Sequence, residues 1–315
     1  MVVSLETSVA GVPLERFAFN ASGPICSTLN ELREIGISGS SVITTKSCTL
    51  HARSGNPEPR WAELPLGGLQ AMGLPNEGYE YYLSAVPALK VNCAKPVCVS
   101  VSGLTLDANK RMVDAFQYSE TPPDLLEINL SCPNIAGKPQ VGYDVQQTRE
   151  TLRIISEIGG PVPLGLKLPP YFDMSHFDAM ADVIRDYSSV RFLTTVNSVG
   201  NALVVDYETE TPVIKPKGGF GGLSGSYIKP IGLANTRAFY ERLGSRVDIV
   251  GVGGVTSGKD AFEYLLVGAS AVQIGSPLMT EGLGCFDRVH GEISDILQRK
   301  GDADVTSVKG RLHIL

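Results

Sequence analysis

The 315-residue sequence predicts an α/β fold made of repeated βα units, because short apolar runs alternate with longer amphipathic stretches along the chain. Eight runs resemble buried parallel strands, at residues 17–20, 41–45, 97–101, 125–129, 164–168, 192–197, 248–251 and 271–274. Helical patterning is clearest at residues 28–35, 107–118, 148–158, 174–187, 234–243, 259–267 and 285–300. Eight repeats in a chain of this length favour a closed (β/α)8 TIM barrel over an open doubly wound sheet.

Two long segments, residues 48–76 and 201–227, interrupt this alternation. Both follow predicted strands, so we expect long inserted loops at the C-terminal face of the barrel strands, where barrel active sites are built. Their apolar and aromatic content argues against disorder, and the second is expected to contain a small hairpin near residues 203–214. We find no linker or further repeat and expect one domain over residues 1–315.

Composition and charge exclude several classes of function. The formal net charge is -6, which argues against nucleic acid or an anionic membrane surface as a partner. No apolar run approaches the roughly 18–20 residues of a membrane helix, and the first residues do not resemble a signal peptide. The six cysteines show no CxxC pair and the four histidines are scattered. We therefore expect a reduced, cytoplasmic protein without a metal site.

One strand end carries an unusual group of polar and reactive side chains. The predicted strand at 125–129 runs into Asn129-Leu130-Ser131-Cys132-Pro133-Asn134, where Pro133 prevents simple continuation of a strand or a helix. A single cysteine beside a proline is usually inert. Here amides and a hydroxyl flank it, and a second strand end, Asn197-Ser198, carries the same amide and hydroxyl pair. We infer that Cys132 takes part in chemistry.

Other strand ends add hydroxyl groups and two lysines. Ser22 follows Asn20 at the first strand end, Lys46 and Ser47 follow the second strand, and Lys167 lies inside the apolar fifth strand. A buried lysine is costly unless something negative meets it. Either lysine alone is explained equally well by an ion pair with a glutamate of a neighbouring strand. Two lysines with amides at adjacent strand ends favour an electron-rich polar ligand over the barrel mouth.

Glycines follow the last two strands. Glycine allows backbone N–H groups to approach a phosphate, and a helix N-terminus, here near residues 257–259, adds its positive dipole end. Barrels often bind phosphate at these two loops. A flavin mononucleotide fits this pattern, with Lys167 opposite the N1–C2=O edge of its ring, whereas no GxGxxG follows the first strand to indicate a dinucleotide. The expected phosphate-side residues are Gly225, Gly253, Gly254, Gly275 and Ser276.

At these residues the chain resembles the dihydroorotate dehydrogenase family, in its soluble, fumarate-linked class (class 1A). The likeness covers nearly the whole chain in order, and the string around Cys132 is highly specific. The matching stretches are 20–23, 45–47, 55–60, 72–76, 129–134, 137–140, 167–172, 197–201, 213–217, 253–254 and 273–275. The membrane-bound class differs in having an N-terminal membrane-associating extension and a serine base.

The resemblance implies oxidation of (S)-dihydroorotate to orotate in de novo pyrimidine (UMP) biosynthesis, with FMN as cofactor, fumarate as acceptor and a homodimer as the assembly. It implies that Cys132 is the general base that removes the C5 proton. By the same resemblance, FMN contacts Ser22, Lys46, Ser47, Asn129, Lys167, Val196, Gly225, Gly253, Gly254, Gly275 and Ser276. The substrate contacts Lys46, Gln70, Ala71, Met72, Gly73, Leu74, Asn129, Asn134, Asn197 and Ser198.

The chain departs from the family pattern just before Met72. The family normally shows Ile-Asn-Ser there, whereas this chain reads Leu69-Gln70-Ala71, so that Gln70 carries the amide on a longer stem. A second departure, Leu223-Ser224-Gly225 in place of Ile-Gly-Gly, is expected to matter little. Two alternatives remain open: a related FMN oxidoreductase that acts on another dihydropyrimidine or uses another acceptor, and a catalytically inactive binding barrel.

Overall fold

The computed structural model describes residues 3–131 and 140–315. Within these residues, eight parallel strands form one sheet in the order β3-β16-β15-β10-β9-β8-β7-β4, which confirms the predicted barrel strands. In chain order they are β3 (Ala18–Asn20), β4 (Ile43–Thr44), β7 (Val97–Val101), β8 (Leu125–Asn129), β9 (Leu164–Leu168), β10 (Val190–Thr195), β15 (Asp248–Val252) and β16 (Ala271–Ile274).

A side chain helps to close the barrel between its first and last strands in the sheet order, β3 and β4. The Asn20 Nδ2 donates to the Thr44 carbonyl at 2.7 Å, and the Thr44 N–H donates to Asn20 Oδ1 at 2.8 Å. This amide therefore makes the pair of bonds that a backbone ladder would make. Asn20 is fully buried, so its role in the strand end is structural.

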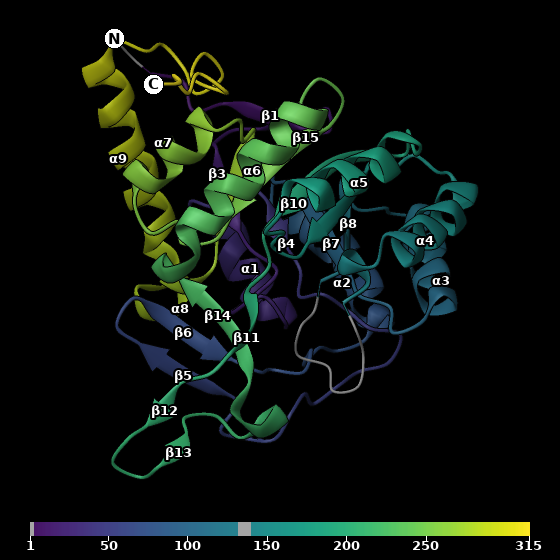
Figure 1. Cartoon of the computed structure of the whole chain (residues 1–315). Coiled ribbons are helices and arrows are strands. Elements are labelled where there is room, and N and C mark those ends of the chain that lie inside the picture. Colours follow the sequence, from purple (N-terminus) through teal and green to yellow (C-terminus); the bar gives the residue numbers. More distant parts are fainter. Residues whose placement is uncertain (1–2, 132–139) are drawn as a thin grey trace.

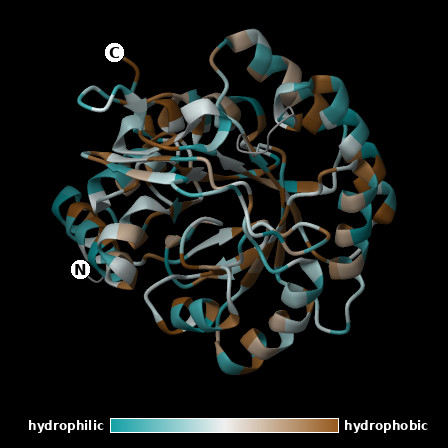
Figure 2. Cartoon of the chain, turned by 90° about the horizontal axis from the view of Figure 1, so that it is seen from below, coloured by the Kyte–Doolittle hydropathy of each residue, from teal (hydrophilic) through white to brown (hydrophobic). Residues whose placement is uncertain are grey.

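Helices surround the strands as a ring (Figure 2). Several begin at a capping side chain; Thr28 accepts from the Glu31 N–H while Glu31 bonds back, and Asp173 accepts from the His176 N–H. Helix α2 was not predicted, because Pro87 interrupts its pattern. The helices are α1 (Leu29–Ile37), α2 (Tyr79–Asn92), α3 (Leu106–Gln117), α4 (Val145–Ile158), α5 (Met174–Arg185), α6 (Lys229–Leu243), α7 (Gly258–Leu266), α8 (Ser276–Thr280) and α9 (Cys285–Lys300).

The two long inserted segments pair with each other. They supply β5 (Trp61–Leu64), β6 (Gly67–Gln70), β11 (Val199–Ala202) and β14 (Gly221–Gly225), which form a four-stranded antiparallel sheet in the order β11-β14-β6-β5. This sheet lies at one end of the barrel (Figure 1). The expected hairpin is present as β12 (Val205–Asp206) and β13 (Thr211–Pro212), which extends away from the barrel.

The remaining elements are short. A hairpin of β1 (Thr7–Val9) and β2 (Val12–Leu14) precedes the barrel, and the described ends lie close together, since the Ser4 N–H donates to the Ala303 carbonyl at 3.0 Å. The 3-10 turns are η1 (Val141–Tyr143), η2 (Pro216–Gly219), η3 (Ser226–Ile228) and η4 (Gly282–Gly284). In the described part of the chain, no helix is both long and apolar enough to cross a membrane.

Apolar side chains fill the space between strands and helices, but part of the barrel interior is polar. Glu127 on β8 is fully buried. Its two oxygens accept from Ser100 Oγ at 3.0 Å and Thr194 Oγ1 at 2.7 Å, and Ser47 Oγ lies 2.9 Å from Ser100 Oγ. This hydroxyl chain satisfies the buried carboxylate and connects it to the strand ends above.

Candidate active site

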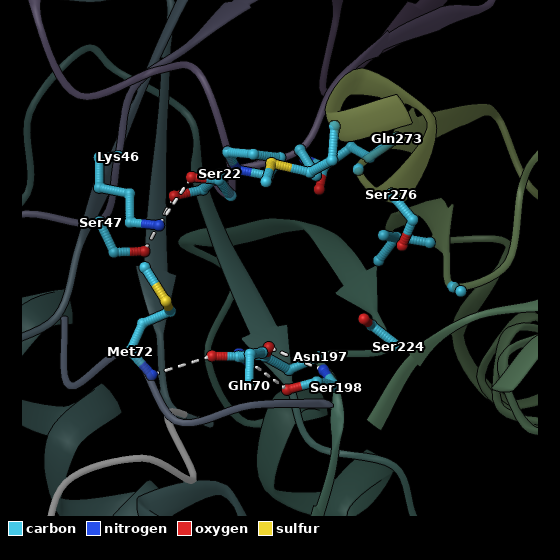
Figure 3. A pocket seen from close by; sticks show the side chains of 18 of the residues that line it. Ser22, Lys46, Ser47, Gln70, Met72, Asn197, Ser198, Ser224, Gln273 and Ser276 are labelled. Atoms are coloured by element: carbon cyan, nitrogen blue, oxygen red, sulfur yellow. Dashed lines mark hydrogen bonds between the residues drawn. The ribbon is translucent and has the colours of Figure 1, made fainter. Parts of the chain in front are cut away.

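A cavity of about 490 Å³ lies where the carboxyl ends of the barrel strands meet the four-stranded sheet. Its volume is in the range of cavities that hold a cofactor or a small ligand. Three groups of side chains surround it in Figure 3: Ser22, Lys46 and Ser47; Gln70, Met72, Asn197 and Ser198; and Ser224, Gln273 and Ser276.

Most of the predicted site residues line this cavity. They are Ser22, Lys46, Ser47, Gln70, Met72, Gly73, Leu74, Asn129, Lys167, Val196, Asn197, Ser198, Gly225, Gly253, Gly254, Gly275 and Ser276. Ala71 does not line it; its side chain is buried in a small apolar cluster with Leu69 and Ile214, beneath the cavity wall. Cys132 and Asn134 lie outside the described residues.

The amide side chains are held in fixed orientations by one another. Asn129 Nδ2 donates to Ser47 Oγ at 3.1 Å, while its Oδ1 accepts from the Ser131 N–H at 3.1 Å and from Asn197 Nδ2 at 3.3 Å. The Ser198 N–H donates to Asn197 Oδ1 at 2.8 Å. Because both ends of the Asn129 amide are engaged, its donor and acceptor directions are set before any ligand binds.

Gln70 continues this network to the inserted sheet. Its Nε2 donates to Ser198 Oγ at 3.1 Å, and its Oε1 accepts from the Met72 N–H at 3.2 Å (Figure 3). Gln70 therefore ties the end of β6 to the loop after β10. The longer stem, compared with the asparagine of the family pattern, brings the amide to both partners.

The two lysines have different surroundings. Lys46 Nζ donates to the Gly23 carbonyl at 2.6 Å. Lys167 is 4% exposed and lines the cavity, yet its amino group makes no hydrogen bond or ion pair with any residue that the structure describes. The neighbouring-strand glutamate, Glu127, is engaged by Ser100 and Thr194 instead. A structural ion pair therefore does not account for Lys167, and its charge is available to a ligand in the cavity.

Close backbone packing explains two of the glycines on the other side of the cavity. Gly225 has φ +81°, and a Cβ there would lie 2.3 Å from the Gly67 Cα. Gly254 has φ +69°, and a Cβ would lie 2.7 Å from the Lys229 Cβ. Both positions exclude any side chain, so that backbone groups face the cavity.

The N-terminus of α7 does not contribute to the cavity, contrary to the expectation for residues 257–259. The Ser257 side chain caps the helix by accepting from the Asp260 N–H, and the Gly258 N–H donates to Glu292 at 2.6 Å. The chain's own carboxylate therefore takes this donor, whereas Gly253, Gly254, Gly275 and Ser276 line the cavity.

Comparison with known proteins identifies the family. A sequence model described as dihydroorotate dehydrogenase matches residues 4–297. The chain is 45% identical to a dihydroorotate dehydrogenase (fumarate) of Saccharomyces cerevisiae over 315 residues, covering 99% of both chains. It is 47% identical to the Trypanosoma cruzi protein of the same name over 297 residues, covering 94% of both. The chain belongs to the dihydroorotate dehydrogenase family.

A solved structure shares the fold. The dihydroorotate dehydrogenase of Eimeria tenella in complex with ferulenol superimposes with a TM-score of 0.81 at 18% identity, covering 98% of this chain and 88% of that one. A likeness at this identity concerns architecture alone, and it agrees with the barrel described above.

The cavity also contains residues that sequence reasoning missed. Gln273 on β16 is 1% exposed, and its Oε1 has no hydrogen-bond partner among the described residues. Trp61 on β5 and Ser224 on β14 reach the cavity from the inserted sheet. A polar residue within the apolar run 271–274 was the available signal for Gln273, whereas Trp61 depends on how the inserted segments pair.

Among the described residues, no group of three His, Cys, Asp or Glu side chains is arranged to hold a metal ion. The cysteines that the structure describes are all buried free thiols.

Proposed function

We propose that this chain oxidises (S)-dihydroorotate to orotate for pyrimidine biosynthesis, using bound FMN and passing the electrons to fumarate. The observation that carries the proposal is the identity of about 45% over the full chain with proteins named dihydroorotate dehydrogenase (fumarate). The cavity supports it, because the hydroxyl, amide, lysine and glycine groups expected from seven strand ends surround one space.

The donor set of the cavity fits FMN. Lys167 offers a buried cation without a partner among the described residues, and Gln273 offers a buried amide whose oxygen is also without one there. Gly253, Gly254, Gly275 and Ser276 lie at the other side, where backbone groups suit a phosphate. When bound, FMN supplies a two-electron carrier that dihydroorotate can reduce and fumarate can oxidise.

On the substrate side, Asn129, Asn197 and Ser198 present amide and hydroxyl groups that match the alternating donors and acceptors of a pyrimidine edge. Lys46 lines the same cavity, and we assign to it the compensation of the substrate carboxylate's charge. The backbone from Met72 to Leu74 forms the facing wall. Hydrogen bonds already fix the side chains of Asn129, Asn197 and Ser198. These side chains can therefore orient the pyrimidine ring without rearranging.

We assign proton removal from C5 to Cys132. The residue lies outside the described part of the chain, but the segment that leads into it is held in place. The Leu130 N–H donates to the Lys167 carbonyl at 3.0 Å, and the Ser131 N–H donates to Asn129 Oδ1. The last described residues before Cys132 are therefore fixed at the end of β8, next to Asn129 and Lys167, which line the cavity.

The purified protein is expected to be yellow and to hold one FMN per chain without a covalent bond. Dihydroorotate should bleach the colour under anaerobic conditions, and fumarate should restore it, because both act on the same electron carrier. Absorbance near the flavin bands during sequential anaerobic additions measures this. Release of FAD on heating, a colourless preparation, or no bleaching by dihydroorotate would contradict the proposal.

Replacing Gln70 with alanine is expected to lower kcat/KM for dihydroorotate by about 5-fold to 150-fold. The change removes two hydrogen bonds, to Ser198 and to the Met72 N–H, each contributing about 0.5–1.5 kcal/mol. Gln70→Asn should also be impaired, because the shorter side chain does not span both partners. Steady-state kinetics with dihydroorotate and with dihydrouracil, which lacks the carboxylate, measures both variants.

Gln70 also bears on the second candidate function, an FMN oxidoreductase for another dihydropyrimidine. Under that alternative, Gln70→Asn would raise dihydroorotate turnover above wild type by restoring the family residue. A wild-type preference for dihydrouracil would overturn the substrate assignment while leaving the flavin site in place. Glu63→Gln on the neighbouring strand β5, which does not line the cavity, serves as a control.

We further propose a cytoplasmic homodimer, as the family resemblance implies. Large apolar side chains on the inserted segment, Leu203, Val205, Tyr207 and Phe220, are exposed and would be covered by a second copy. Light scattering of the purified protein tests the assembly, and cell fractionation tests the location. A mass of one chain at micromolar concentration, or recovery with membranes, would contradict these statements.

A further inference from the structure

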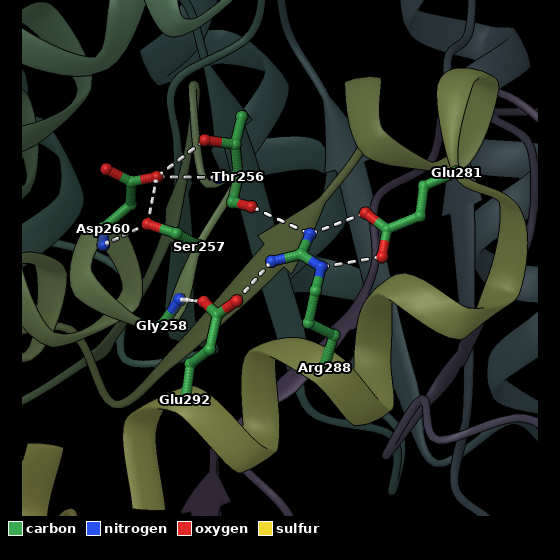
Figure 4. A network of polar contacts seen from close by, with 7 residues as sticks. All are labelled: Thr256, Ser257, Gly258, Asp260, Glu281, Arg288 and Glu292. Atoms are coloured by element: carbon green, nitrogen blue, oxygen red, sulfur yellow. Dashed lines mark hydrogen bonds and ion pairs between the residues drawn. The ribbon is translucent and has the colours of Figure 1, made fainter. Parts of the chain in front are cut away.

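A network of polar contacts joins the segments that follow β15 and β16, the two last barrel strands (Figure 4). It connects the loop after β15, which carries Gly253 and Gly254, with the segment after β16, which carries Gly275 and Ser276. We call Thr256, Ser257, Gly258, Asp260, Glu281, Arg288 and Glu292 the rear cluster. None of them lines the cavity, so their contribution to a ligand is indirect.

Arg288 on α9 is the centre of the rear cluster. Its Nε and Nη2 donate to the two oxygens of Glu281 at 2.7 and 2.6 Å, a bidentate pair. Its Nη1 donates to Glu292 at 2.8 Å, and its Nη2 also donates to the Thr256 carbonyl at 3.0 Å. One guanidinium therefore holds the loop after β15 and the segment after α8 at a fixed separation.

Further bonds extend this link to the backbone that faces the cavity. Glu292 accepts from the Gly258 N–H through its other oxygen at 2.6 Å. Asp260 accepts from the Thr256 N–H at 3.0 Å and from Lys229 Nζ at 2.7 Å. Lys229 in turn packs where Gly254 lacks a side chain. The position of the Gly253–Gly254 turn is therefore coupled to Arg288 through both Thr256 and Asp260.

Arg288 also balances the charge of two glutamates, Glu281 and Glu292, with which it forms ion pairs. Hydrogen bonds from Arg288 lower the pKa of Glu281, so that this carboxylate is charged across the neutral range. Without Arg288, the Glu281 and Glu292 carboxylates would lose their shared guanidinium partner. Without Arg288, these charges would repel a bound phosphate, in addition to the loss of positioning.

We propose that Arg288 is a positioning residue for the phosphate of the bound flavin: it sets the affinity for the phosphate monoester and not for the ring. This inference rests on the proposed function, in which FMN occupies the cavity. Replacing Arg288 should therefore change the affinity for a flavin that carries the phosphate, and not for one that lacks it. Riboflavin, which lacks the phosphate, is therefore the comparison ligand.

The test measures dissociation constants of FMN and riboflavin for the full-length chain freed of flavin, by the change in flavin fluorescence on binding. Arg288→Met is expected to weaken FMN binding by about tenfold, equivalent to about 1.4 kcal/mol. Riboflavin binding should change by less than about twofold, because the groups around the ring are untouched. Arg288→Lys keeps the positive charge but loses the guanidinium that bonds both oxygens of Glu281. It should therefore weaken FMN binding by a smaller factor than Arg288→Met does.

Arg153→Met is the matched control. Arg153 on α4 also bonds two glutamates, Glu150 at 2.9 Å and Glu157 at 2.6 Å, but it belongs neither to the cavity lining nor to the rear cluster. It should leave both dissociation constants unchanged. If Arg288→Met does not fold, Arg288→Lys provides the test. The ratio of its FMN and riboflavin dissociation constants is then compared with that of the wild type.

Equal weakening of FMN and riboflavin would overturn the inference, because Arg288 would then support the barrel in general. Unchanged FMN affinity in both Arg288 variants would overturn it as well. Failure of the proposed function gives a different result: the wild-type chain itself would not prefer FMN to riboflavin. Weaker FMN binding with unchanged riboflavin binding in the Arg288 variants, and no change in Arg153→Met, would support the inference about Arg288.

Discussion

Replacing Cys132 with alanine is expected to lower the rate of flavin reduction by dihydroorotate by roughly 10²–10⁴-fold, the usual contribution of a general base. The flavin should stay bound, because the expected cofactor contacts come from other residues. Burial raises the pKa of the Cys26, Cys48 and Cys98 thiols, and that of Cys285 to about 12, so these thiols stay protonated near neutral pH. None of them can replace Cys132. Anaerobic stopped-flow absorbance measures the reduction rate directly.

Two further variants give this experiment its controls. Cys132→Ser should keep some activity, shifted to higher pH, because a hydroxyl gives up its proton less readily than a thiol. Cys285→Ala, at a buried thiol outside the cavity, should reduce flavin at the wild-type rate. The base assignment is wrong if Cys132→Ala reduces flavin as fast as wild type while dihydroorotate binding is unchanged.

Replacing Lys167 with methionine is expected to slow flavin reduction by roughly 10²–10³-fold, the range for losing one preorganised charge. A cation beside the flavin stabilises the negative charge that appears on reduction, so its loss makes the reduction potential more negative. A charge-assisted hydrogen bond contributes about 1.5–3 kcal/mol, which for two electrons corresponds to roughly 30–65 mV. Spectroelectrochemical titration measures the potential, and stopped-flow absorbance measures the rate.

The flavin-free chain provides an independent test of the same residue. Lys167 is buried without a partner among the described residues, and an unpaired buried cation opposes folding. Lys167→Met should therefore keep or raise the melting temperature of the flavin-free chain. Lys90→Met, which removes a lysine paired with Asp124 at 2.9 Å away from the cavity, should leave the potential unchanged. An unchanged potential in Lys167→Met would rule out this role.

Local sequence was sufficient to predict many of the residues that gather at the cavity. Parallel βα units place every carboxyl strand end on one side of the barrel. For that reason Ser22, Lys46, Asn129, Asn197 and Gly253, which are far apart in the chain, lie around the same space. The local pattern did not predict α2, because Pro87 lies inside this helix. Packing of its buried side chains against the barrel stabilises the helix despite the proline.

The function of individual side chains depended on contacts that no local pattern contains. Asn20 was expected among the polar strand ends, but its amide bonds Thr44 and helps to close the barrel. Gln70 was expected to face the substrate, and its amide also bonds Ser198 and the Met72 N–H. In each case the partner comes from another segment, so the role could not be deduced from the residue and its neighbours in sequence.

By itself, the sequence determined the order of the eight barrel strands and the family, because alternation and specific strings are properties of neighbouring residues. Only the tertiary structure decided how the two inserted segments close the site. Gly68 and Ser224 are 156 positions apart, yet Ser224 Oγ donates to the Gly68 carbonyl at 3.0 Å within the sheet over the barrel mouth. The tertiary structure also decided that the Glu292 carboxylate accepts the Gly258 N–H at the N-terminus of α7. Pairing between distant segments depends on the backbone partners that the whole fold brings together, which short-range patterns do not specify.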